Sequence, residues 1–435
     1  FKSQSSDEKF NFVYEKIADL GDEFFVQLSE KFVSNLKTGD LFNLLKDISL
    51  SLPGIFISMP FFTTMKHMFS GRDLLEQLQE RFLSQSNPDK KILWFSDTVN
   101  DLNGVSFIVK RITSIACSKG KNIKLVACLN NEESTAEDLP AEYINLPYIY
   151  EFNLPHYESY LMRIPSVLKS MEIISQENPD EIYISTPGPV GLIALLIAKL
   201  MNIKATGVYH TDFKMQLDAI DEENGISDLT EAYTKWFYEC MDSIKVPTAE
   251  YISLLSQRGF DSSKMSVFRR GIEEDLFYPL ENAREILNKK YNLEEGFNLL
   301  YVGRISKDKN LDFMLNIYEI LLQKYPKLNL IIAGDGPYLK TLKKNNLHLK
   351  RLIFADKVAR ENLNLLYSGS DLFFFPSNTD TFGMVVLEAQ ACGLPALVSD
   401  MGGPKEIVID EQTGWVAKAN DSYDWIQKTL SVINL

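Results

Sequence analysis

The chain has 435 residues, of which 45% are hydrophobic and 24% are charged, and these values exclude a disordered or collagen-like chain. Its 45 basic against 59 acidic side chains give a formal net charge of −14, which argues against a general nucleic-acid binder. A chain of this length is expected to form two or three domains.

The first part of the chain, residues 1–89, reads as a helical extension. The segments FNFVYEKIADLGDEFFVQLSEKFVSNL and RDLLEQLQERFLSQ place apolar residues three and four positions apart, which is the spacing of an amphipathic helix. Neither strand alternation nor a chemical motif occurs in this part of the sequence.

The extension contains an uncharged run, Ile48–Met65 (ISLSLPGIFISMPFFTTM). The run is shorter than the roughly 20 residues that a spanning helix needs, and its two prolines argue against one straight helix. We therefore expect a buried helical hairpin. The alternative is an interfacial membrane element beside the basic residues Lys66, His67 and Arg72.

From Lys91 onward, short apolar runs alternate with helical stretches. The runs in residues 90–281 are KILWFSD, NIKLVAC, EIYISTPG, IKATGVYHTD, SIKVPT and MSVFRRG, and those in 282–435 are FNLLYVGR, LNLIIAGDG, RLIFAD, DLFFFPS and PALVSD. This pattern is typical of parallel strands in α/β sheets. It predicts two successive doubly wound units, with a ligand at the carboxyl ends of their strands and between the units.

A basic pair follows the first strand of the second unit, in YVGRISKDKN. Arg304 and Lys309 on one strand-end loop are suited to neutralising a diphosphate. The alternative is an ordinary solvated basic loop.

Two acids flank a helix start in PSNTDTFGMVVLEAQACGLP. Backbone N–H groups of Gly383, Met384 and Val385 open the predicted helix, and a helix N-terminus binds anions. Asp380 in the loop and Glu388 two turns into the helix are suited to accepting hydrogen bonds from sugar hydroxyls. The alternatives are a helix N-cap acid for the first and an exposed helix residue for the second.

Two further strand ends carry candidate residues. In GVYHTDF, His210 ends a strand, and Asp212 is placed to orient it or to contact a substrate; a structural histidine is the alternative. In DTVNDLNGVS, Asn103 and Gly104 lie in the first strand-to-helix loop, where backbone amides can meet a phosphate.

These motifs occur in an order that resembles the family 4 retaining glycosyltransferases of group 1. VGRISKDKN, IIAGDGP, TDTFGMVVLEAQACGLP and SDMGGPKEIV are similar to the carboxyl half of that family, and ISTPGPVGL, YHTDF and FRRGIEEDLFYP are similar to its amino half. The resemblance runs from about Lys91 to the end. It implies the GT-B fold, in which two Rossmann-like domains face a cleft, here behind the helical extension.

The resemblance also implies roles for the candidate residues. Arg304 and Lys309 match the pair that holds the donor diphosphate, and Glu388 matches the acid that binds the donor ribose. Asp380 stands where the family usually has Glu beside the transferred sugar, which leaves the sugar open. His210 matches the cleft histidine near the reacting end of the sugar.

The remaining implied contacts are with the donor and the acceptor. Phe382, Gly383, Met384 and Val385 match the segment whose backbone touches sugar and phosphate, Gly104 matches the glycine under the phosphates, and Lys357 and Val358 fall where the family holds the base. Asn103 and Asp212 are candidates for the acceptor side.

The function implied is transfer of a hexose from a UDP- or GDP-linked sugar, with retained configuration, to a lipid or glycan acceptor. Bacterial members that modify lipids or glycans are the most similar. Because phosphate charge would be met by protein cations, we expect neither a metal nor a cofactor. The alternatives are a GT-B epimerase and a non-catalytic module that binds nucleotide-sugar or scaffolds a larger protein.

The expected location is the cytoplasm. The four cysteines lie far apart without a CxxC pair, which predicts free thiols rather than a zinc site or disulfides. If Ile48–Met65 meets a membrane, the protein is peripheral on its inner face.

Overall fold

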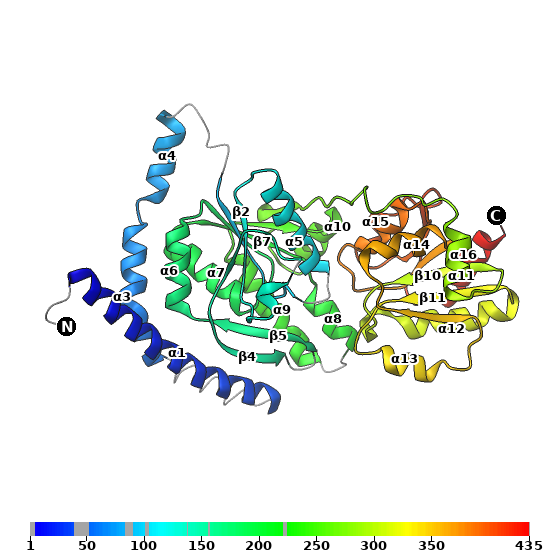
Figure 1. The fold of residues 1–435 in the computed structure, drawn as a ribbon, viewed down its shortest axis with the longest axis horizontal. Helices are drawn as coiled ribbons and strands as arrows, with labels where there is room; N and C mark the ends of the chain where they lie inside the picture. The colour runs from blue at the N-terminus through cyan, green and yellow to red at the C-terminus, as the bar shows by residue number, and fades with distance from the viewer. Residues whose placement is uncertain are drawn as a thin grey trace. The chain divides into compact units, whose positions relative to one another are not determined.

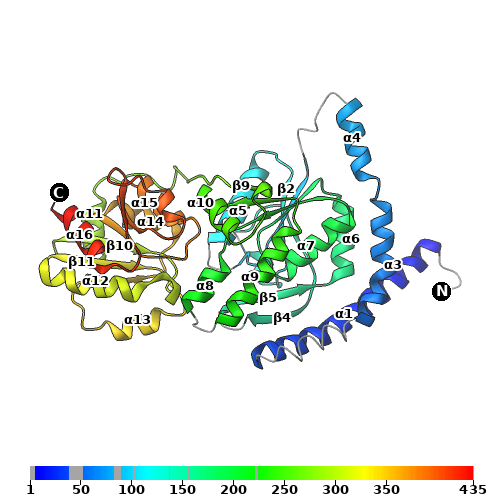
Figure 2. The ribbon, with the colours of Figure 1, turned by 180° about the vertical axis from the view of Figure 1, so that it is seen from behind.

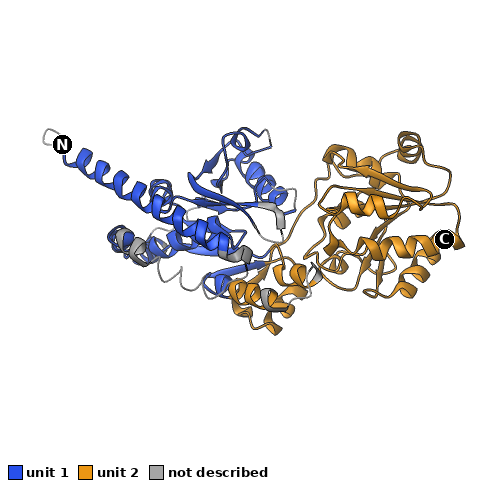
Figure 3. Cartoon of the chain, turned by 90° about the horizontal axis from the view of Figure 1, so that it is seen from below, with its two compact units in different colours: residues 1–209, 236–245 blue, residues 210–235, 246–435 orange. Residues whose placement is uncertain are grey.

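The computed structural model describes residues 5–38, 52–82, 90–100, 104–136, 138–154, 157–220 and 224–434. The chain forms two compact units, which comprise residues 1–209 with 236–245 and residues 210–235 with 246–435 (Figure 3). His210 therefore belongs to the second unit. The division at 89 and 281 stays a prediction.

The helical extension is confirmed over the described residues. Its helices are α1 (Ser6–Thr38), α3 (Leu52–Met68) and α4 (Arg72–Phe82). Helix α1 packs on α6 (Val167–Glu177) within the first unit (Figure 1). The Tyr14 hydroxyl donates to the Leu168 carbonyl at 2.6 Å, and the Ser166 hydroxyl donates to Asp22 at 2.7 Å. The extension is thus docked by specific polar contacts.

The hairpin expected over Ile48–Met65 is wrong for the part that is described. Residues 48–51 lie outside the described residues, and from Leu52 onward one helix, α3, continues through Pro60 to Met68. The Thr64 hydroxyl donates to the Pro60 carbonyl at 2.7 Å, so the turn after the proline keeps a polar contact. Helix α3 contacts α1 and α7. Among the described residues, no helix combines the length and the apolar character needed to cross a membrane.

One sheet has seven strands in the order β3-β2-β1-β6-β7-β8-β9. The strands are β1 (Ile92–Phe95), β2 (Ile123–Ala127), β3 (Tyr143–Asn145), β6 (Glu181–Ile184), β7 (Lys204–Val208), β8 (Ser243–Val246) and β9 (Met265–Val267). The helices along this stretch are α5 (Gly104–Ser118), α6, α7 (Pro189–Leu200), α8 (Phe213–Ile220), α9 (Asn224–Glu239) and α10 (Ala249–Gln257). Strands β2, β1, β6, β7 and β8 pair in parallel, as their apolar runs predict. Strand β3, which pairs in parallel with β2, was not predicted.

An antiparallel pair of strands was not predicted. Strands β4 (Tyr148–Leu154) and β5 (Tyr157–Pro165) form a separate two-stranded sheet. Their sequences mix polar residues such as Glu151 and Asn153 with aromatic ones, so they lack the short apolar run that marks the buried parallel strands.

A second sheet has six strands, all parallel, in the order β12-β11-β10-β13-β14-β15. The strands are β10 (Phe297–Val302), β11 (Leu328–Ala333), β12 (Leu352–Asp356), β13 (Leu372–Phe375), β14 (Ala396–Ser399) and β15 (Gly414–Ala417). The helices are α11 (Ala283–Tyr291), α12 (Leu311–Lys324), α13 (Leu339–Asn345), α14 (Leu363–Ser368), α15 (Met384–Ala391) and α16 (Ser422–Ile433). Strand β15 was not predicted.

Helices cover both faces of the second sheet, as expected for a doubly wound unit. Helices α12 and α14 lie on opposite sides of it (Figures 1 and 2). Trp425 of α16 is fully buried, with its ring centroid 4.8 Å from that of Phe374 on β13. The core is therefore continuous from the terminal helix to the central strands.

The strand order places the candidate loops together. From β10 the chain first builds outward through β11 and β12, and then returns to the other side of β10 with β13 and β14. The switch of direction falls between β10 and β13, and ligands of such sheets bind outside the carboxyl ends at this point. The loops that follow these two strands carry Arg304, Lys309 and Asp380.

The docking of α1 gives a first prediction. Lys169 on α6 lies 3.1 Å from Asp19 and 3.2 Å from Asp22, so Lys169→Glu would place three like charges together. We expect cleavage within residues 5–38 by a limiting amount of protease to accelerate about two- to fivefold. The matched control is Lys119→Glu at an exposed position. Equal cleavage rates in the two variants would contradict the docking.

Candidate functional site

A lysine held between two aspartates joins the loops after β10 and β13. Lys309 closes the short 3-10 turn Lys307–Lys309, and only 9% of it is exposed. Its Nζ lies 2.9 Å from Asp380 Oδ2 and 3.2 Å from Asp308 Oδ2. This burial rules out the solvated basic loop that was the alternative for this residue.

Lys309, Asp308 and Asp380 form a triad in which opposite charges stabilise one another. Burial alone would lower the pKa of Lys309, but the Asp380 and Asp308 carboxylates raise it above its ordinary value. Burial raises the pKa of Asp308, and Lys309 with two hydroxyl donors reverses this and lowers it. The ammonium is therefore charged. Because two of its three protons face carboxylates, one remains to donate to a ligand.

The loop after β13 is fixed by hydroxyl and backbone contacts. Thr379 Oγ1 donates to Asp308 Oδ2 at 3.1 Å, and the backbone N–H of Gly403 donates to the Asp380 carbonyl at 2.8 Å. A Cβ on Gly403 would stand 2.0 Å from the Thr381 carbonyl oxygen, so only glycine fits there. In the sequence, Gly403 is the second glycine of the GG pair in SDMGGPKEIV. The sequence analysis quoted this motif but assigned its glycines no role in the site.

Gly383 begins the helix whose N-terminus was predicted to bind an anion. It is the N-cap of α15 with φ +88°, a conformation that favours glycine. Asp380 is not the N-cap residue, so the structural alternative for this acid is wrong. Phe382, Met384 and Val385 are half-buried around the same turn.

His210 is buried against the Asp380–Gly383 loop, with 6% of it exposed. Thr381 Oγ1 donates to its carbonyl at 2.5 Å, and its Nδ1 lies 3.3 Å from Arg270 Nη2. A guanidinium can only donate, so Nδ1 is the acceptor and the imidazole proton resides on Nε2. Burial, and then the Arg270 charge, lower the pKa of His210 well below its ordinary value. The imidazole is therefore a neutral donor.

Asp212 is committed to an internal ion pair. Its carboxylate receives two hydrogen bonds from Arg258, at 2.6 and 3.1 Å, and also accepts from the backbone N–H of Met215 at 3.2 Å. Arg258 also pairs with Glu231. Asp212 is fully buried. These contacts fix the start of α8. They indicate that Asp212 supports the segment that carries His210 rather than contacting an acceptor directly.

Glu388 is also held by protein groups. It is 1% exposed, which excludes the exposed helix residue that was its alternative. Its Oε1 lies 2.7 Å from Arg360 Nη1, and the Tyr367 hydroxyl donates to its Oε2 at 3.0 Å. Burial raises the pKa of Glu388, and Arg360 only partly offsets this.

Arg360 was missed by the sequence analysis. Besides Glu388 it contacts Glu273 at 3.0 Å, and its guanidinium lies 4.8 Å from the Phe277 ring centroid. It follows the predicted base-binding residues by two positions, but no sequence feature separates it from other surface arginines. It holds the Glu388 carboxylate in place at 2.7 Å.

The other predicted residues lie at strand ends. Arg304 follows β10 and is half-buried, and its carbonyl accepts from the Tyr301 hydroxyl at 3.0 Å. Lys357 is exposed after β12, and Val358 packs on the core. In the first unit Gly104 begins α5, and a Cβ added there would have nothing within 4 Å. Asn103 lies outside the described residues.

In the first unit, the strand order reverses between β1 and β6, and an acid that was not predicted from the sequence lies at this point. Asp97 follows β1 and accepts from Thr186 Oγ1 at 2.6 Å and from the backbone N–H of Val190 at 2.7 Å. Burial raises the pKa of Asp97 to about 6. A Cβ on Gly188 would meet the Asp97 carboxyl at 2.5 Å. Asp97 thus fastens the start of α7 to the end of β1.

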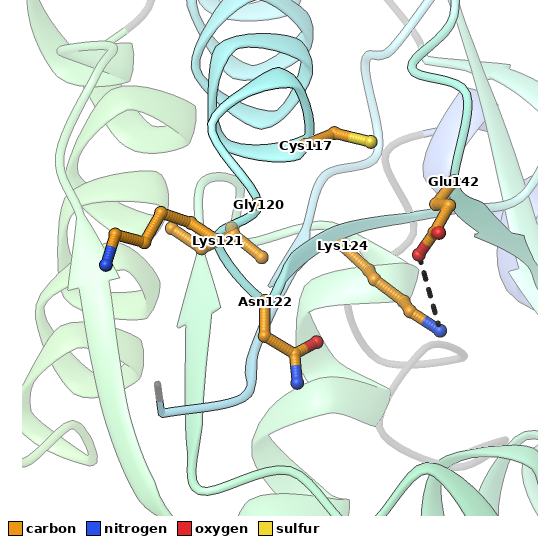
Figure 4. Close-up of a pocket in the computed structure, with 7 residues that line it drawn as sticks. Cys117, Gly120, Lys121, Asn122, Lys124 and Glu142 are labelled. Atoms are coloured by element: carbon orange, nitrogen blue, oxygen red, sulfur yellow. Dashed lines mark ion pairs between the residues drawn. The ribbon is translucent and has the colours of Figure 1, made fainter. Parts of the chain in front are cut away.

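A hollow of about 360 Å³ lies elsewhere in the first unit (Figure 4). It is bounded by the end of α5, from Cys117 to Gly120, and by the start of β2, with Lys124 4.0 Å from Glu142 across it. This is the amino edge of the strands, at the opposite end of α5 from Gly104. It contains no predicted site residue.

Replacing Lys309, the central residue of the triad, should lower the stability of the fold. Lys309→Met would leave Asp308 and Asp380 facing one another without a cation, so we expect a loss of about 3–5 kcal/mol in the free energy of unfolding. The loss should shrink below about pH 5 because the carboxylates then take up protons. Urea unfolding at neutral pH and below about pH 5 measures the loss in unfolding free energy at each pH. The control is Lys307→Met, at an exposed neighbouring lysine. A loss no larger than that of the control would contradict the triad.

The neutral state of His210 predicts a pH dependence of stability. Its native pKa lies below the unfolded value of about 6.5, so below that pH the unfolded chain binds a proton that the native state refuses. His210→Asn should therefore reduce the fall in unfolding free energy between pH 7 and 5, by up to about 1.4 kcal/mol per pH unit. Urea unfolding across this range tests it against His348→Asn, at an exposed histidine. An unchanged slope in His210→Asn would refute the assignment.

Two family models match adjacent parts of the chain. The model described as Glycosyltransferase Family 4 matches residues 103–276, and the model described as Glycosyl transferases group 1 matches residues 283–435. The junction between the two matches falls just before α11.

Relatives of known name are glycosyltransferases. The chain is 25% identical over 308 residues to the sulfoquinovosyl transferase of Arabidopsis thaliana, a match that covers 69% of this chain and 59% of the relative. It is 29% identical over 255 residues to the alpha-monoglucosyldiacylglycerol synthase of Streptococcus pneumoniae, covering 57% of each. The chain thus spans less than two thirds of the length of these two relatives.

Solved structures agree in fold. The sucrose-phosphate synthase of Thermosynechococcus elongatus superposes with a TM-score of 0.64 at 19% identity, and the Anabaena protein HepE, solved with UDP and glucose, with 0.63 at 16%. Each match covers 79% of this chain and 90% of the other. The fold is GT-B, built from two Rossmann-like units and preceded here by the helical extension. From the two matching family models and this fold, the chain belongs to the group 1, family 4 glycosyltransferases.

Proposed function

We propose that this chain transfers a hexose from a nucleoside-diphosphate sugar to a lipid or glycan acceptor with retention of the anomeric configuration. The donor would bind outside the carboxyl ends of β10 and β13. The observation that carries the proposal is the buried Lys309, which is held by Asp308 and Asp380 beside the glycine-led N-terminus of α15.

The chemical demand is stabilisation of a leaving diphosphate while the bond to the sugar breaks. Arg304, the remaining N–H of Lys309 and the backbone N–H groups after Gly383 would meet the developing negative charge. Asp380 would accept hydrogen bonds from sugar hydroxyls. The Nε2–H of neutral His210 would donate to the sugar near its reacting carbon, which is a positioning role that needs no change in protonation.

The nucleoside would lie along the loop after β12. Glu388, held by Arg360 and Tyr367, would accept from the ribose hydroxyls, and Lys357 with Val358 would flank the base. From the resemblance, Gly104 is proposed for the phosphates and Asn103 for the acceptor side. Because protein cations supply the charge in this scheme, we propose that transfer needs neither a metal nor a cofactor; activity that survives EDTA would support this.

A lipid is the proposed acceptor class. One of the two relatives above is an alpha-monoglucosyldiacylglycerol synthase, and another relative, from Mycolicibacterium smegmatis, is a GDP-mannose-dependent alpha-(1-6)-phosphatidylinositol monomannoside mannosyltransferase. The choice between UDP and GDP is left to the donor screen. We also propose a cytoplasmic location with peripheral membrane contact through Ile48–Met65.

The test is transfer from a panel of UDP- and GDP-sugars to lipid extracts and to glycans, with product linkage read by NMR. With an active pair in hand, Arg304→Ala should lower kcat by about 10²–10³ because a donor to the leaving phosphate is lost. Arg269→Ala, at an exposed arginine, is the matched control. Donor binding without transfer to any acceptor would favour the non-catalytic module, and an inverted product would refute retention.

A further inference from the structure

Arg270 carries an unusual set of contacts beside the proposed donor site. It lies in the FRRG segment after β9, and its guanidinium lies 4.7 Å from the ring centroid of Phe382. Its Nη2 faces His210 Nδ1 at 3.3 Å. Its Nε is buried and has no hydrogen-bond partner in the part of the chain that the structure describes. Both partners that it does have are uncharged.

Arg270 is half-buried with a buried Nε, and an arginine in such a position is normally paired with a carboxylate because withdrawing an unpaired charge from water is costly. Among the described residues, no acid forms an ion pair with Arg270. Burial lowers the pKa of Arg270 to about 10, so the group still carries its charge at neutral pH. The structure therefore maintains a positive charge, and a buried donor, without a protein counter-ion.

The charge balance of the neighbouring loop shows where this cation would be useful. Lys309 is matched by two carboxylates, so the triad as a whole carries one negative charge. Arg304 adds one positive charge, which leaves no surplus for an acidic ligand. Arg270 and Lys309 contact opposite ends of the same short segment, through Phe382 and Asp380 respectively.

We propose that Arg270 is an anion-binding residue of the donor site, which takes an acidic oxygen of the bound nucleotide-sugar. The inference rests on the proposed function and adds a residue and a charge requirement to it. The guanidinium lies over the Phe382 ring, and His210 Nδ1 faces Nη2. The orphan Nε shares one edge of the guanidinium with Nη2, and Nη2 carries two N–H groups, so one can serve His210 while the other joins Nε in the two-pronged geometry that phosphate and carboxylate share.

Two parts of a donor could supply that oxygen. One is the diphosphate, which every nucleotide-sugar carries. The other is an acidic group on the transferred sugar, as in a glycuronic acid. The chemistry at Arg270 is the same for both, so the distinction is made by comparing ligands that share the diphosphate and differ in the sugar.

The experiment is calorimetric titration of the full chain with UDP, UDP-glucose, UDP-glucuronic acid, GDP and GDP-mannose. Wild type is compared with Arg270→Gln, which keeps a planar polar group but removes the charge. Arg269→Gln is the matched control, since the adjacent arginine is exposed. The melting temperature of each variant is recorded, so that a loss of binding is distinguished from a loss of the fold.

We expect Arg270→Gln to raise Kd by about tenfold or more for a ligand that wild type binds, because a charge-assisted contact is lost. Arg269→Gln should leave Kd within about twofold, as for a surface charge. An equal loss for UDP and every UDP-sugar assigns the contact to the diphosphate. A loss confined to UDP-glucuronic acid assigns it to the sugar acid.

Two results overturn the proposal in distinguishable ways. If wild type binds none of the ligands, the proposed function fails and the inference fails with it. If wild type binds and Arg270→Gln binds every ligand equally well, the inference alone fails. Should Arg270→Gln not fold, Arg270→Lys replaces it: loss of the planar fork should weaken binding at least about threefold, and unchanged binding overturns the proposal.

Discussion

The candidate site depends on one buried interaction, the ammonium of Lys309 between Asp308 and Asp380. It spans the point where the order of the second sheet reverses, and so it ties the first strand-end loop of this sheet to the fourth. Once Asp380 is fixed, Thr381 reaches the His210 carbonyl and Gly383 can begin α15 in its left-handed conformation. The glycine at 403 then permits the close approach of the next loop.

This arrangement alters the electrostatics that the sequence suggests. From the sequence, Arg304 and Lys309 are expected to be two cations available to a diphosphate. In the fold, however, the charge of Lys309 is already balanced by the carboxylates of Asp308 and Asp380. The same holds for the acids, since Asp212 and Glu388 each face an arginine. Positive charge near the Asp380–Gly383 loop that is not matched by these carboxylates therefore depends on Arg304, Arg270 and the helix N-terminus.

The sequence predicts the parallel strands and the strand-end residues well because both depend on local pattern. Runs such as ILWF and LNLIIA are buried on both faces, so their composition alone marks them. It does not predict β4 and β5, whose polar positions interrupt the pattern, or the helix that continues through Pro60, which depends on packing against α1 and α7. Arg270, Arg360 and Asp97 were missed because their roles arise from partners that are distant in the sequence. The separation is 60 residues from Arg270 to His210, 28 and 87 residues from Arg360 to Glu388 and Glu273, and 89 residues from Asp97 to Thr186.

The contact with Lys309 explains how an aspartate fits at position 380. A glutamate would reach one methylene further, and Lys309 holds the shorter carboxylate close to the loop at 2.9 Å. In the proposed site a sugar would therefore find more room at this point, and Lys309 already contacts one of the two carboxylate oxygens. The same segment is contacted by two donor residues, His210 through Thr381 and Arg270 through Phe382. A shorter acceptor beside these donors favours a sugar with an acceptor group of its own at that position, and such a preference would be set by this loop rather than by the diphosphate pair.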